Sequence, residues 1–252
     1  MGLSYLVYPG AIQVLKLKNV EITEEEEKGL LCAILLHDIG HGPFSHALEG
    51  FVAKEISHEQ ISLRFMMELN QEFNGELDTA ISIFQGDYPK SFLNQLVSSQ
   101  LDMDRLDYLK RDSFYSGVTE GNINSERLIS MLNVVDGDLM VEEKAIYAVE
   151  KFLMARRFMY WQVYLHKTGL VAEQLLVRIM QRARLLLSQG KNLPGSEPLL
   201  FFLKNNGTLN FDKEVLETFA KLDDIDILGA LKSWQSDDDF VLSKLCGMLL
   251  ER

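Results

Sequence analysis

The sequence predicts an all-α protein with one short β-hairpin near residues 133–142. Three observations predict this fold class. Apolar residues recur at helical spacing over most of the chain. Two helix starts carry a Ser or Thr followed three residues later by Glu or Gln. One stretch, "NVVDGDLMVEE", has two short apolar runs around an Asp-Gly turn, which is the signal of a hairpin.

The first clear helix lies in "ITEEEEKGLLCAILLHD". Thr23 is the expected N-cap, and Glu26 three residues later completes a capping box. The acidic residues of the first turn suit the positive end of the helix dipole. Gly40 is placed to stop this helix, and Gly42-Pro43 is placed to start the next one.

The later elements follow from the same signals. Ser57 and Gln60 form a second capping pair ahead of an amphipathic helix. Further helices are expected over about 90–112 and from 142 to about 189. "GKNLPGSEP" at 190–198 has the Gly, Pro and Ser content of a linker. The chain is therefore divided into residues 1–190 and a helical C-terminal accessory region, residues 191–252.

Composition and charge narrow the class of protein. The longest clean apolar run, "LLCAILL", is too short to cross a bilayer, and "MGLSYLVYPGA" lacks the features of a signal peptide. Cys32 and Cys246 show no metal or redox spacing. A net charge of −12 argues against a general nucleic-acid binder. We therefore expect a cytoplasmic protein with no membrane partner and no extended nucleic-acid surface.

One segment departs from this acidic balance. Between Lys151 and Arg184 there are seven Lys or Arg residues and one Glu. A local basic segment in an acidic protein favours a compact polyphosphate ligand over a long polymer. A solvated helix face is the alternative.

Histidines are concentrated in "LLHDIGHGPFSH", residues 35–46, which holds three of the five in the chain. An imidazole beside a carboxylate, as in His37 and Asp38, suits a divalent metal ion. The alternative for such a pair is a buried His bonded to backbone next to an exposed Asp. The presence of His41, His46 and His58 close by favours a functional site.

Two predicted helices carry further polar clusters. In "LDMDRLDYLKRD", Asp104, Tyr108 and Asp112 fall on one face with Arg105 beside them. These groups can ligate a metal or hold a phosphate. The alternative is a solvated face with ion pairs such as Asp107–Arg111.

In "ARRFMYWQVYLHK", Arg156, Tyr160, Tyr164 and Lys167 are spaced by 4, 4 and 3 residues and are predicted to share one face. Cations and phenols in one stripe fit phosphate oxygens and a stacked base or sugar. The alternative is an amphipathic core helix whose Arg and Lys stems lie along apolar surface.

Together, "LLHDIGHGPFSHALE", the following "HEQ" and "SSQLDMDRLDYLKRDSFYSG" resemble the HD-domain phosphohydrolases. The nearest branch is that of the SAM-and-HD-domain dNTP triphosphohydrolase and its bacterial relatives. The resemblance is strong over residues 1–190 and weaker in "DDDFVLSKLCGMLLER". It implies the mainly helical HD-domain fold for 1–190 and an incomplete accessory region in 191–252.

The resemblance also implies roles for individual residues. His37 and Asp38 resemble the paired metal ligands, and Asp104, rather than the nearby Asp102, resembles the aspartate that completes the metal shell. The implied catalytic residues around the phosphate are His41, His46, His58, Glu49 and Glu59. The implied substrate-binding residues are Arg105, Tyr108, Asp112, Arg156, Tyr164, His166 and Lys167.

One motif of the family is missing. In the family, "YPGA" is followed by a segment of the type H-x-R-F-x-H-S-L-G, which supplies a further metal-binding histidine. Here "VYPGA" runs straight into "IQVLKLKNVEITEEEE", and every histidine lies at or after His37. Either the protein has lost this segment, or residues are omitted from the chain. Since both flanks look normal for the family, we favour omission.

The resemblance implies a metal-dependent hydrolase that converts dNTPs to a deoxynucleoside and triphosphate. Its cofactor would be a divalent ion, Mn, Fe, Mg, Zn or Ni, and its assembly a homo-oligomer, dimer or tetramer. Two alternatives stay open. One is an HD phosphohydrolase acting on nucleoside monophosphates or other phosphomonoesters, and the other is a nucleotide-binding regulatory module without turnover.

Overall fold

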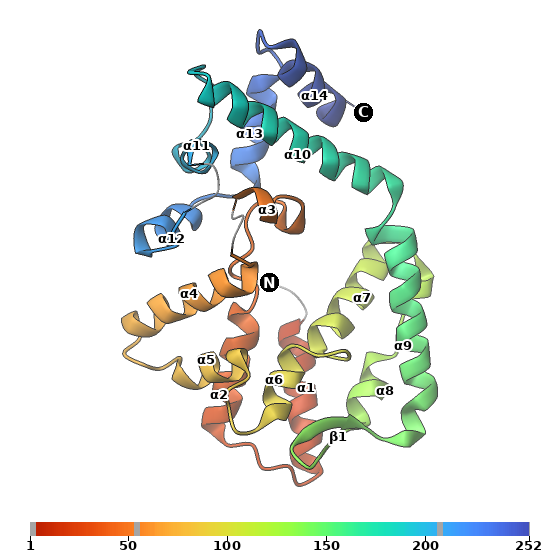
Figure 1. Ribbon diagram of the computed structural model, residues 1–252. Helices are drawn as coiled ribbons and strands as arrows, with labels where there is room; N and C mark the ends of the chain where they lie inside the picture. The colour runs from red at the N-terminus through yellow and green to blue at the C-terminus, as the bar shows by residue number, and fades with distance from the viewer. Residues whose placement is uncertain (1–3, 53–55, 206–208, 252) are drawn as a thin grey trace. The chain divides into compact units, whose positions relative to one another are not determined.

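The structure is a computed structural model that describes residues 4–52, 56–205 and 209–251. The regular secondary structure of the described residues is helical apart from one antiparallel hairpin (Figure 1). The predicted all-α class with a single hairpin is therefore confirmed. No described helix is both long enough and apolar enough to span a membrane.

The chain divides into two compact units. Unit 1 comprises residues 1–37 and 66–166, and unit 2 comprises residues 38–65 and 167–252. Each unit is assembled from two separate stretches of sequence, so neither coincides with the division at residue 190. That division by family resemblance stays a prediction.

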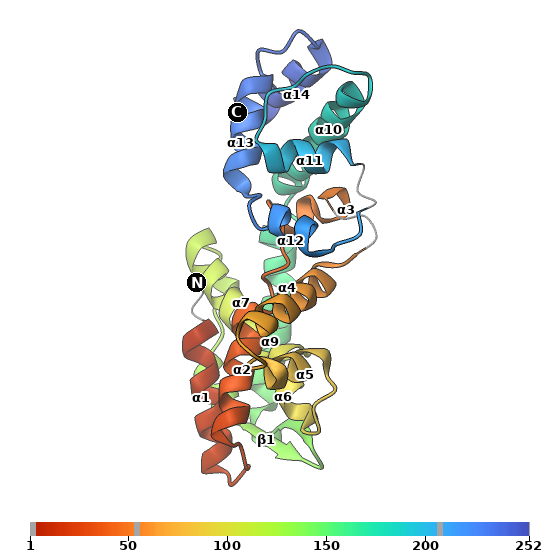
Figure 2. The ribbon, with the colours of Figure 1, turned by 90° about the vertical axis from the view of Figure 1, so that its left-hand side faces the viewer.

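Unit 1 is built around α1 and α2, which lie side by side (Figure 2). Its elements are α1 (Ser4–Leu17), α2 (Glu24–Leu36), the second half of α4 (His58–Glu72), α5 (Asp78–Gln85), α6 (Ser91–Val97), α7 (Met103–Ser116), α8 (Ser125–Ser130), β1 (Leu132–Val135), β2 (Asp138–Val141), α9 (Ile146–Met159) and a π-helical turn, Tyr160–Tyr164. The core is formed by buried residues such as Leu15, Leu30, Leu93, Leu106 and Phe152. Helix α2 approaches α5 closely because Gly29 has no side chain: a Cβ there would lie 2.6 Å from Cγ2 of Thr79.

The predicted capping box at the start of α2 is confirmed. The backbone N–H of Glu26 donates to Oγ1 of Thr23 at 3.1 Å, and the N–H of Thr23 donates to Oε2 of Glu26 at 2.8 Å. The Glu26 side chain is buried and also accepts from Lys90 and Tyr88. Burial alone would raise the pKa of Glu26, but the hydrogen bonds from Lys90, Thr23 and Tyr88 lower it. The cap therefore also ties α2 to the segment before α6.

The hairpin forms where the Asp-Gly signal predicted it. Strand β1 pairs with β2 in the register Leu132↔Val141 to Val135↔Asp138. Asp136 and Gly137 both have positive φ, 53° and 90°, which is the requirement of a type I′ turn.

The buried residues of α1 bear on the missing family motif. Helix α1 runs without interruption through Ala11 and Ile12, and both side chains are buried in the core of unit 1. The chain thus closes this part of the core without the segment that carries the family's first metal-binding histidine.

Three predicted helix boundaries are wrong. Residues 90–112 form two helices, because the side chain of Asp102 accepts from the N–H of Arg105 and caps a new helix, α7. The long helix predicted over 142–189 is interrupted by the π-helical turn. Gly42-Pro43 is followed only by a 3₁₀ turn, Ser45–Ala47, and not by an α-helix, because Phe44 and Ser45 have positive φ.

Unit 2 packs short helices around α10. Its elements are a 3₁₀ turn (Ser45–Ala47), α3 (Glu49–Val52), the first half of α4, α10 (Lys167–Ser188), α11 (Glu197–Lys204), α12 (Lys213–Phe219), α13 (Asp224–Trp234) and α14 (Phe240–Leu250). Its core contains Phe202, Trp234, Leu242 and Cys246. Trp234 is fully buried, and its indole N–H donates to the carbonyl of Pro194 at 2.8 Å.

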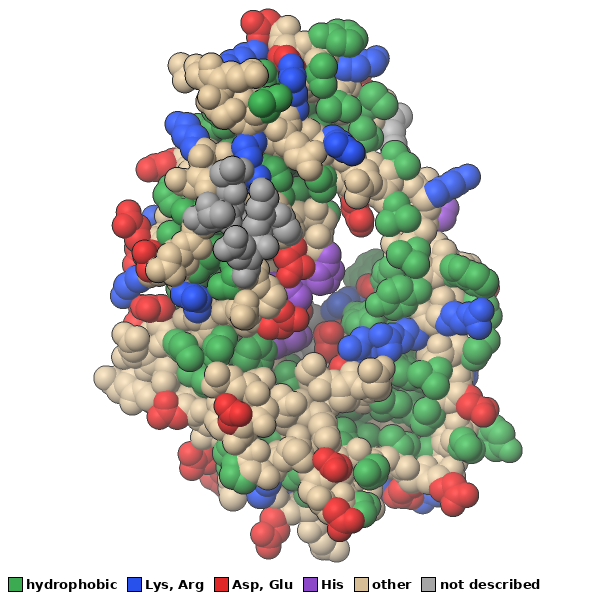
Figure 3. Space-filling view, in the orientation of Figure 1, with side chains coloured by type: hydrophobic (Ala, Val, Ile, Leu, Met, Phe, Trp, Pro, Cys, Tyr) green, Lys and Arg blue, Asp and Glu red, His purple; other side chains and the backbone are tan. Residues whose placement is uncertain are grey.

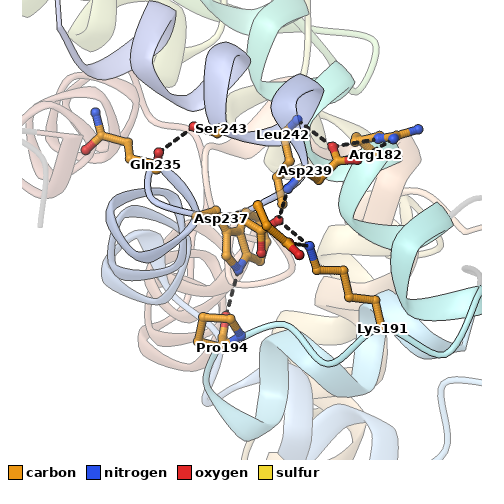
Figure 4. A network of polar contacts seen from close by, with 10 residues as sticks. Arg182, Lys191, Pro194, Gln235, Asp237, Asp239, Leu242 and Ser243 are labelled. Carbon is orange, nitrogen blue, oxygen red and sulfur yellow. Dashed lines mark hydrogen bonds and ion pairs between the residues drawn. The ribbon is translucent and has the colours of Figure 1, made fainter.

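A polar network fastens α14 to α10 (Figure 4). The carboxylate of Asp239 is the N-cap of α14, accepting from the N–H of Leu242 at 2.8 Å, and it also accepts from Nε of Arg182 at 3.0 Å. Lys191 pairs with Asp237 and with the exposed Asp238. The hydrogen bond from Arg182, reinforced by the one from Leu242, lowers the pKa of Asp239 to about 2.

We expect Asp239→Ala to lower the free energy of unfolding by about 1–2 kcal/mol, because it removes a helix cap together with an ion pair. Since the folded pKa lies below the ordinary value of 3.8, the carboxylate stabilises the fold above that value, and this contribution is lost as the pH falls toward 2. As the pH falls below 3.8, the free energy of unfolding should therefore decrease less steeply in the variant than in the wild type. Urea unfolding at several pH values measures both effects, with Asp238→Ala as the matched control. An equal loss in the control would contradict the prediction.

Candidate functional site

His37 and Asp38 follow directly on the last residue of α2. His37 is the C-cap residue, and its Nδ1 lies 2.6 Å from the carbonyl oxygen of Ile34. Since a carbonyl can only accept, Nδ1 donates this hydrogen bond. A histidine that donates through one nitrogen to a backbone carbonyl is oriented as metal-binding histidines usually are.

The loop after Asp38 is held against the start of α4. The N–H of Gly40 donates to Oγ of Ser62 at 2.9 Å, and a Cβ on Gly40 would lie 2.2 Å from the carbonyl oxygen of His58. Only glycine fits this close approach. Further along the loop, the N–H of Phe44 donates to the carboxylate of Asp224 at 2.7 Å. The backbone thus fixes where the side chains of this loop lie.

This arrangement gathers His41, His46 and His58 into one cluster in unit 2. The rings of His41 and His58 are stacked with centroids 4.1 Å apart, and His46 lies edge-on to both, at 4.8 and 5.5 Å. One ring nitrogen from each lies within 4.8 Å of the others. His46 is exposed, whereas His41 and His58 are mostly covered. A ligand would therefore reach the cluster from the side of His46.

Glu49 orients two of these histidines. Its Oε1 lies 2.6 Å from Nδ1 of His58 and accepts the backbone N–H of His58 at 3.1 Å, while Oε2 lies 3.4 Å from Nδ1 of His46. Burial alone would raise the pKa of Glu49, but the hydrogen bonds from His58 and His46 lower it to about 2. Glu49 is therefore a fixed negative charge behind the cluster.

The surroundings of His41 and His58 also affect the charge of the cluster. Burial, with His58 and His46 nearby, lowers the pKa of His41, so the neutral imidazole is favoured. Its Nδ1 is buried without a hydrogen-bond partner. Nε2 of His58 lies 3.3 Å from a carboxylate oxygen of Glu59, and Nε2 of His41 lies 3.7 Å from Asp38. Glu59 thus lies beside the cluster, and its catalytic role, which the resemblance implies, stays a prediction.

Two donor sets are candidates for a divalent metal ion. The first is the predicted set, His37, Asp38 and Asp104, whose imidazole and carboxylates suit Mn, Fe, Mg or Zn. This set stays a prediction, because the possible metal ligands that the structure brings together among the described residues are His41, His46 and His58. The second is the cluster of three histidine nitrogens, which suits Zn, Fe or Ni better than Mg. The orientation of His37 by Ile34 fits the first set, and the unpartnered Nδ1 of His41 fits the second.

Two aspartates at the start of α7, Asp102 and Asp104, occupy different positions in the helix. Asp102 is buried and caps the helix, whereas Asp104 lies in its first turn. Nε of Arg105 donates to Asp102 at 3.0 Å and to the carbonyl of Ser99 at 2.8 Å. Arg105 is therefore partly committed to the cap, which weakens its predicted use as a phosphate clamp. The alternative ion pair is also present, with Arg111 donating to Asp107 at 2.8 Å.

The aromatic groups of α7 and of the π-helical turn meet in unit 1. The hydroxyl of Tyr164 donates to Asp112 at 2.7 Å, and the rings of Tyr108 and Tyr164 are 6.0 Å apart. The guanidinium of Arg156 lies 5.8 Å from the ring centroid of Tyr160, and its Nη1 is 3.5 Å from Oε1 of Gln100. A surface of phenols beside a guanidinium can stack a sugar or base and bind an anionic group.

The predicted stripe on this helix is only partly correct. The side chains of Arg156, Tyr160 and Tyr164 lie together as predicted, although the chain forms a π-helical turn from Tyr160 on instead of the expected α-helix. Lys167 starts a separate helix, α10, and belongs to unit 2, while His166 is the last residue of unit 1. The assignment of His166 and Lys167 to substrate binding stays a prediction.

We expect Arg156→Ala to raise KM for a nucleoside triphosphate about tenfold, and to raise KM for a monophosphate less. A guanidinium that contacts phosphate oxygens contributes about 1.5–3 kcal/mol, and each factor of ten corresponds to about 1.4 kcal/mol. Steady-state kinetics on both substrates measures the difference. Lys151→Ala on the same helix is the matched control, and equal effects on both substrates would reduce Arg156 to a scaffold residue.

Sequence reasoning missed the residues that hold the histidine loop. Ser62 is fully buried and positions Gly40, and Asp224 positions Phe44 across 180 residues of sequence. A serine at a core position of an amphipathic helix is the one signal that was available, because a buried hydroxyl requires a partner. Nothing in the sequence around Asp224 pointed to the loop.

A separate cavity of about 1030 Å³ lies in unit 1. It is lined by α1, α7 and α8, including Gln13, Lys110, Phe114 and Glu126. None of the predicted site residues lines it. The cavity is therefore distinct from the histidine cluster.

Comparisons with known proteins identify the family to which the chain belongs. The HD domain family matches residues 11–112, which contain His37, Asp38 and Asp104, and the HD associated region matches residues 123–191. The crystal structure of a phosphohydrolase from Bacteroides thetaiotaomicron superposes with a TM-score of 0.95 at 52% identity, over 99% of this chain and 62% of that one.

Curated relatives are more distant and longer. The uncharacterized protein YwfO of Bacillus subtilis is 34% identical over 239 residues, which is 92% of this chain and 53% of YwfO. The deoxynucleoside triphosphate triphosphohydrolase SAMHD1 homolog of Dictyostelium discoideum is 32% identical over 188 residues, which is 67% of this chain and 36% of that protein. The chain therefore spans about half the length or less of these relatives. The matched motifs, the helical fold and the neighbouring structure together place this chain in the family of HD-domain phosphohydrolases.

Proposed function

We propose that this chain is a metal-dependent phosphohydrolase that converts dNTPs to a deoxynucleoside and triphosphate. The observation that carries the proposal is the cluster of His41, His46 and His58, oriented by the charged Glu49 and following directly on His37-Asp38. The dNTP substrate is supported by the names of relatives in two organisms, Dictyostelium discoideum and Danio rerio, which are deoxynucleoside triphosphate triphosphohydrolases.

The metal ion is assigned to His37, Asp38 and Asp104. When bound there, a divalent cation would supply Lewis acidity and charge stabilisation at the phosphate under attack. His37 contributes through Nε2, since its Nδ1–H is bonded to Ile34. The same hydrogen bond fixes the direction of the imidazole before any ligand arrives.

The histidine cluster supplies the proton that the reaction needs. Water adds to the α-phosphorus, the bond from that phosphorus to the 5′ oxygen breaks, and the 5′ oxygen takes up a proton to become the deoxynucleoside. His58 is the proposed donor, because Glu49 accepts from its Nδ1 and its Nε2, which lies 3.3 Å from Glu59, is the nitrogen that would donate to the leaving group. His41 is the second and weaker candidate, because burial lowers its pKa and favours the neutral form.

The triphosphate carries negative charge that must be neutralised as the bond breaks. Arg156 and Lys167 are proposed for this role, with a smaller share for Arg105 because its Nε already serves Asp102. Tyr108 and Tyr164 would contact the sugar. These assignments follow the family resemblance and the aromatic cluster of unit 1.

One alternative gains support if the protein truly lacks the first metal-binding histidine of the family. A site with one fewer metal ligand than the family pattern could bind a nucleotide without hydrolysing it, which would make the chain a regulatory module. The monophosphatase alternative has no comparable support in the structure.

A substrate panel tests the proposal. The purified chain is incubated with dNTPs, NTPs and nucleoside monophosphates, first after chelation and then with Mn, Mg, Zn, Fe or Ni added back. We expect triphosphate from dNTPs, no product after chelation, and recovery with at least one metal. Release of inorganic phosphate from monophosphates alone would support the alternative enzyme, and binding of dNTPs without product would support the regulatory module.

A further inference from the structure

A second cavity, of about 790 Å³, lies in unit 2 along α10, and we call it the α10 cavity. Four residues of α10 line it at intervals of 4, 3 and 4 residues, which place them on one face of the helix: Val177, Gln181, Arg184 and Ser188. The 3₁₀ turn, α3 and α11 supply the other walls. None of the described residues that line the cavity belongs to the candidate functional site, and its size suits a small organic molecule.

Arg184 is held in place in the wall of this cavity. Its guanidinium carbon lies 3.7 Å from the ring centroid of Phe51, and its Nη2 donates to the carbonyl oxygen of Phe51 at 2.9 Å. Nε of Arg184 is buried and has no hydrogen-bond partner. A guanidinium has five N–H donors, and folded proteins rarely leave a buried donor without an acceptor. The chain therefore fixes this group in position but satisfies it only in part.

The α10 cavity carries positive charge that the chain does not neutralise. Among the described residues that line it none is acidic, and Arg184 and Lys204 are the two cations. Neither forms an ion pair with a described carboxylate, whereas Arg182, two residues before Arg184, pairs with Asp239. Burial lowers the pKa of Arg184, and no acidic group raises it again. In a chain of net charge −12, two unpaired cations at one cavity indicate an anionic ligand.

The rest of the wall is apolar. Its hydrophobic side chains come from three helices and include Phe51 of α3, Val177 and Leu187 of α10, and Leu203 of α11. Figure 3 shows Lys and Arg side chains beside hydrophobic ones along α10. A polyphosphate would bring several charges against apolar side chains that cannot solvate them. A ligand with one anionic group and an apolar body meets matching surface at both ends.

We infer that the α10 cavity binds a small carboxylate with an apolar body. The carboxylate lies at Arg184 and Lys204, and the apolar body lies against Val177, Leu187 and Leu203. A carboxylate can accept two parallel hydrogen bonds from a guanidinium. Its single charge suits a wall in which one guanidinium is fixed and Lys204 is exposed to solvent. Such a ligand is neither the nucleotide nor the metal ion of the proposed function.

Calorimetric titration of the chain with decanoate, below the concentration at which it forms micelles, tests the inference without any need for activity. We expect saturable binding at one site. Decanol has the same apolar body without the charge, and acetate has the charge without the body, so each should bind at least about tenfold more weakly. Arg184→Met removes the charge but keeps an apolar side chain, and it should raise the dissociation constant of decanoate at least about tenfold.

The matched control is Arg178→Met, which makes the same change at an exposed position of α10 outside the cavity and should leave the dissociation constant unchanged. Lys204→Glu, also at an exposed position, should weaken binding and serves if Arg184→Met does not fold, which circular dichroism checks. The inference is wrong if the wild type binds no decanoate or binds decanol as tightly. It is also wrong if Arg184→Met and Lys204→Glu bind decanoate like the wild type, or if Arg178→Met weakens binding as much as they do. Tighter binding of decyl phosphate than of decanoate would overturn the assignment to a carboxylate.

Discussion

The His37→Ala variant is expected to release no measurable triphosphate from dNTPs. Removing one metal ligand forfeits Lewis acidity worth several kcal/mol at the phosphate, and each 1.36 kcal/mol corresponds to about a factor of ten, so a loss of about 10³-fold or more follows. Nε2 of His37 is the group removed, because Nδ1 serves the carbonyl of Ile34. Ion chromatography of the products measures the loss of triphosphate release, and metal analysis of the same preparation measures the loss of the bound ion.

Metal content separates the two donor sets. Under the proposed assignment, the ion is lost from His37→Ala and retained in His46→Ala. The reverse result would move the ion to the cluster of His41, His46 and His58. Leu35→Ala, at an exposed position of α2 two residues before His37, is the control for the fold. Full turnover by His37→Ala with the metal still bound would refute the ligand assignment altogether.

The parts of the fold that were predicted correctly depend on local chemistry. Thr23 with Glu26, and Asp136 with Gly137, specify a helix start and a turn through groups only one to three residues apart. Such signals are complete within a short window of sequence. The structures that they specify therefore do not depend on how the rest of the chain folds.

The wrong boundaries have causes that a short window does not contain. The helix predicted over 90–112 is cut because Asp102 satisfies the N–H groups of Ser99 and Arg105 in place of helical bonds. Aspartate caps and aspartate in a helix look alike in sequence until the partner groups are known. The π-helical turn at Tyr160–Tyr164 likewise has no distinct sequence signal.

The residues of the candidate site were likewise predicted only in part. The density of histidines in the sequence favoured a functional site, and the structure brings His41, His46 and His58 together in space, because a short loop carries His41 and His46 and α4 begins at His58. The hydroxyl of Ser62 and the carboxylate of Asp224, which hold that loop, were not predicted. Their partners are backbone N–H groups, which every residue offers equally.

The His58→Ala variant is expected to lower kcat for dNTP hydrolysis by about 10²–10⁴-fold with little change in KM, which is the range for loss of a positioned general acid. The stacked His41 would remain but could not replace it, because burial favours its neutral form and its Nδ1 has no carboxylate behind it. Glu49→Gln should give a smaller loss, since it leaves the imidazole in place and removes only the charge that orients it. Met67→Ala, exposed on the same helix, is the control, and retained metal in all three variants makes the comparison valid. If His58→Ala keeps its kcat while His41→Ala loses activity, the role of proton donor belongs to His41 instead. If kcat is unchanged in both variants, neither histidine takes part in the chemical step.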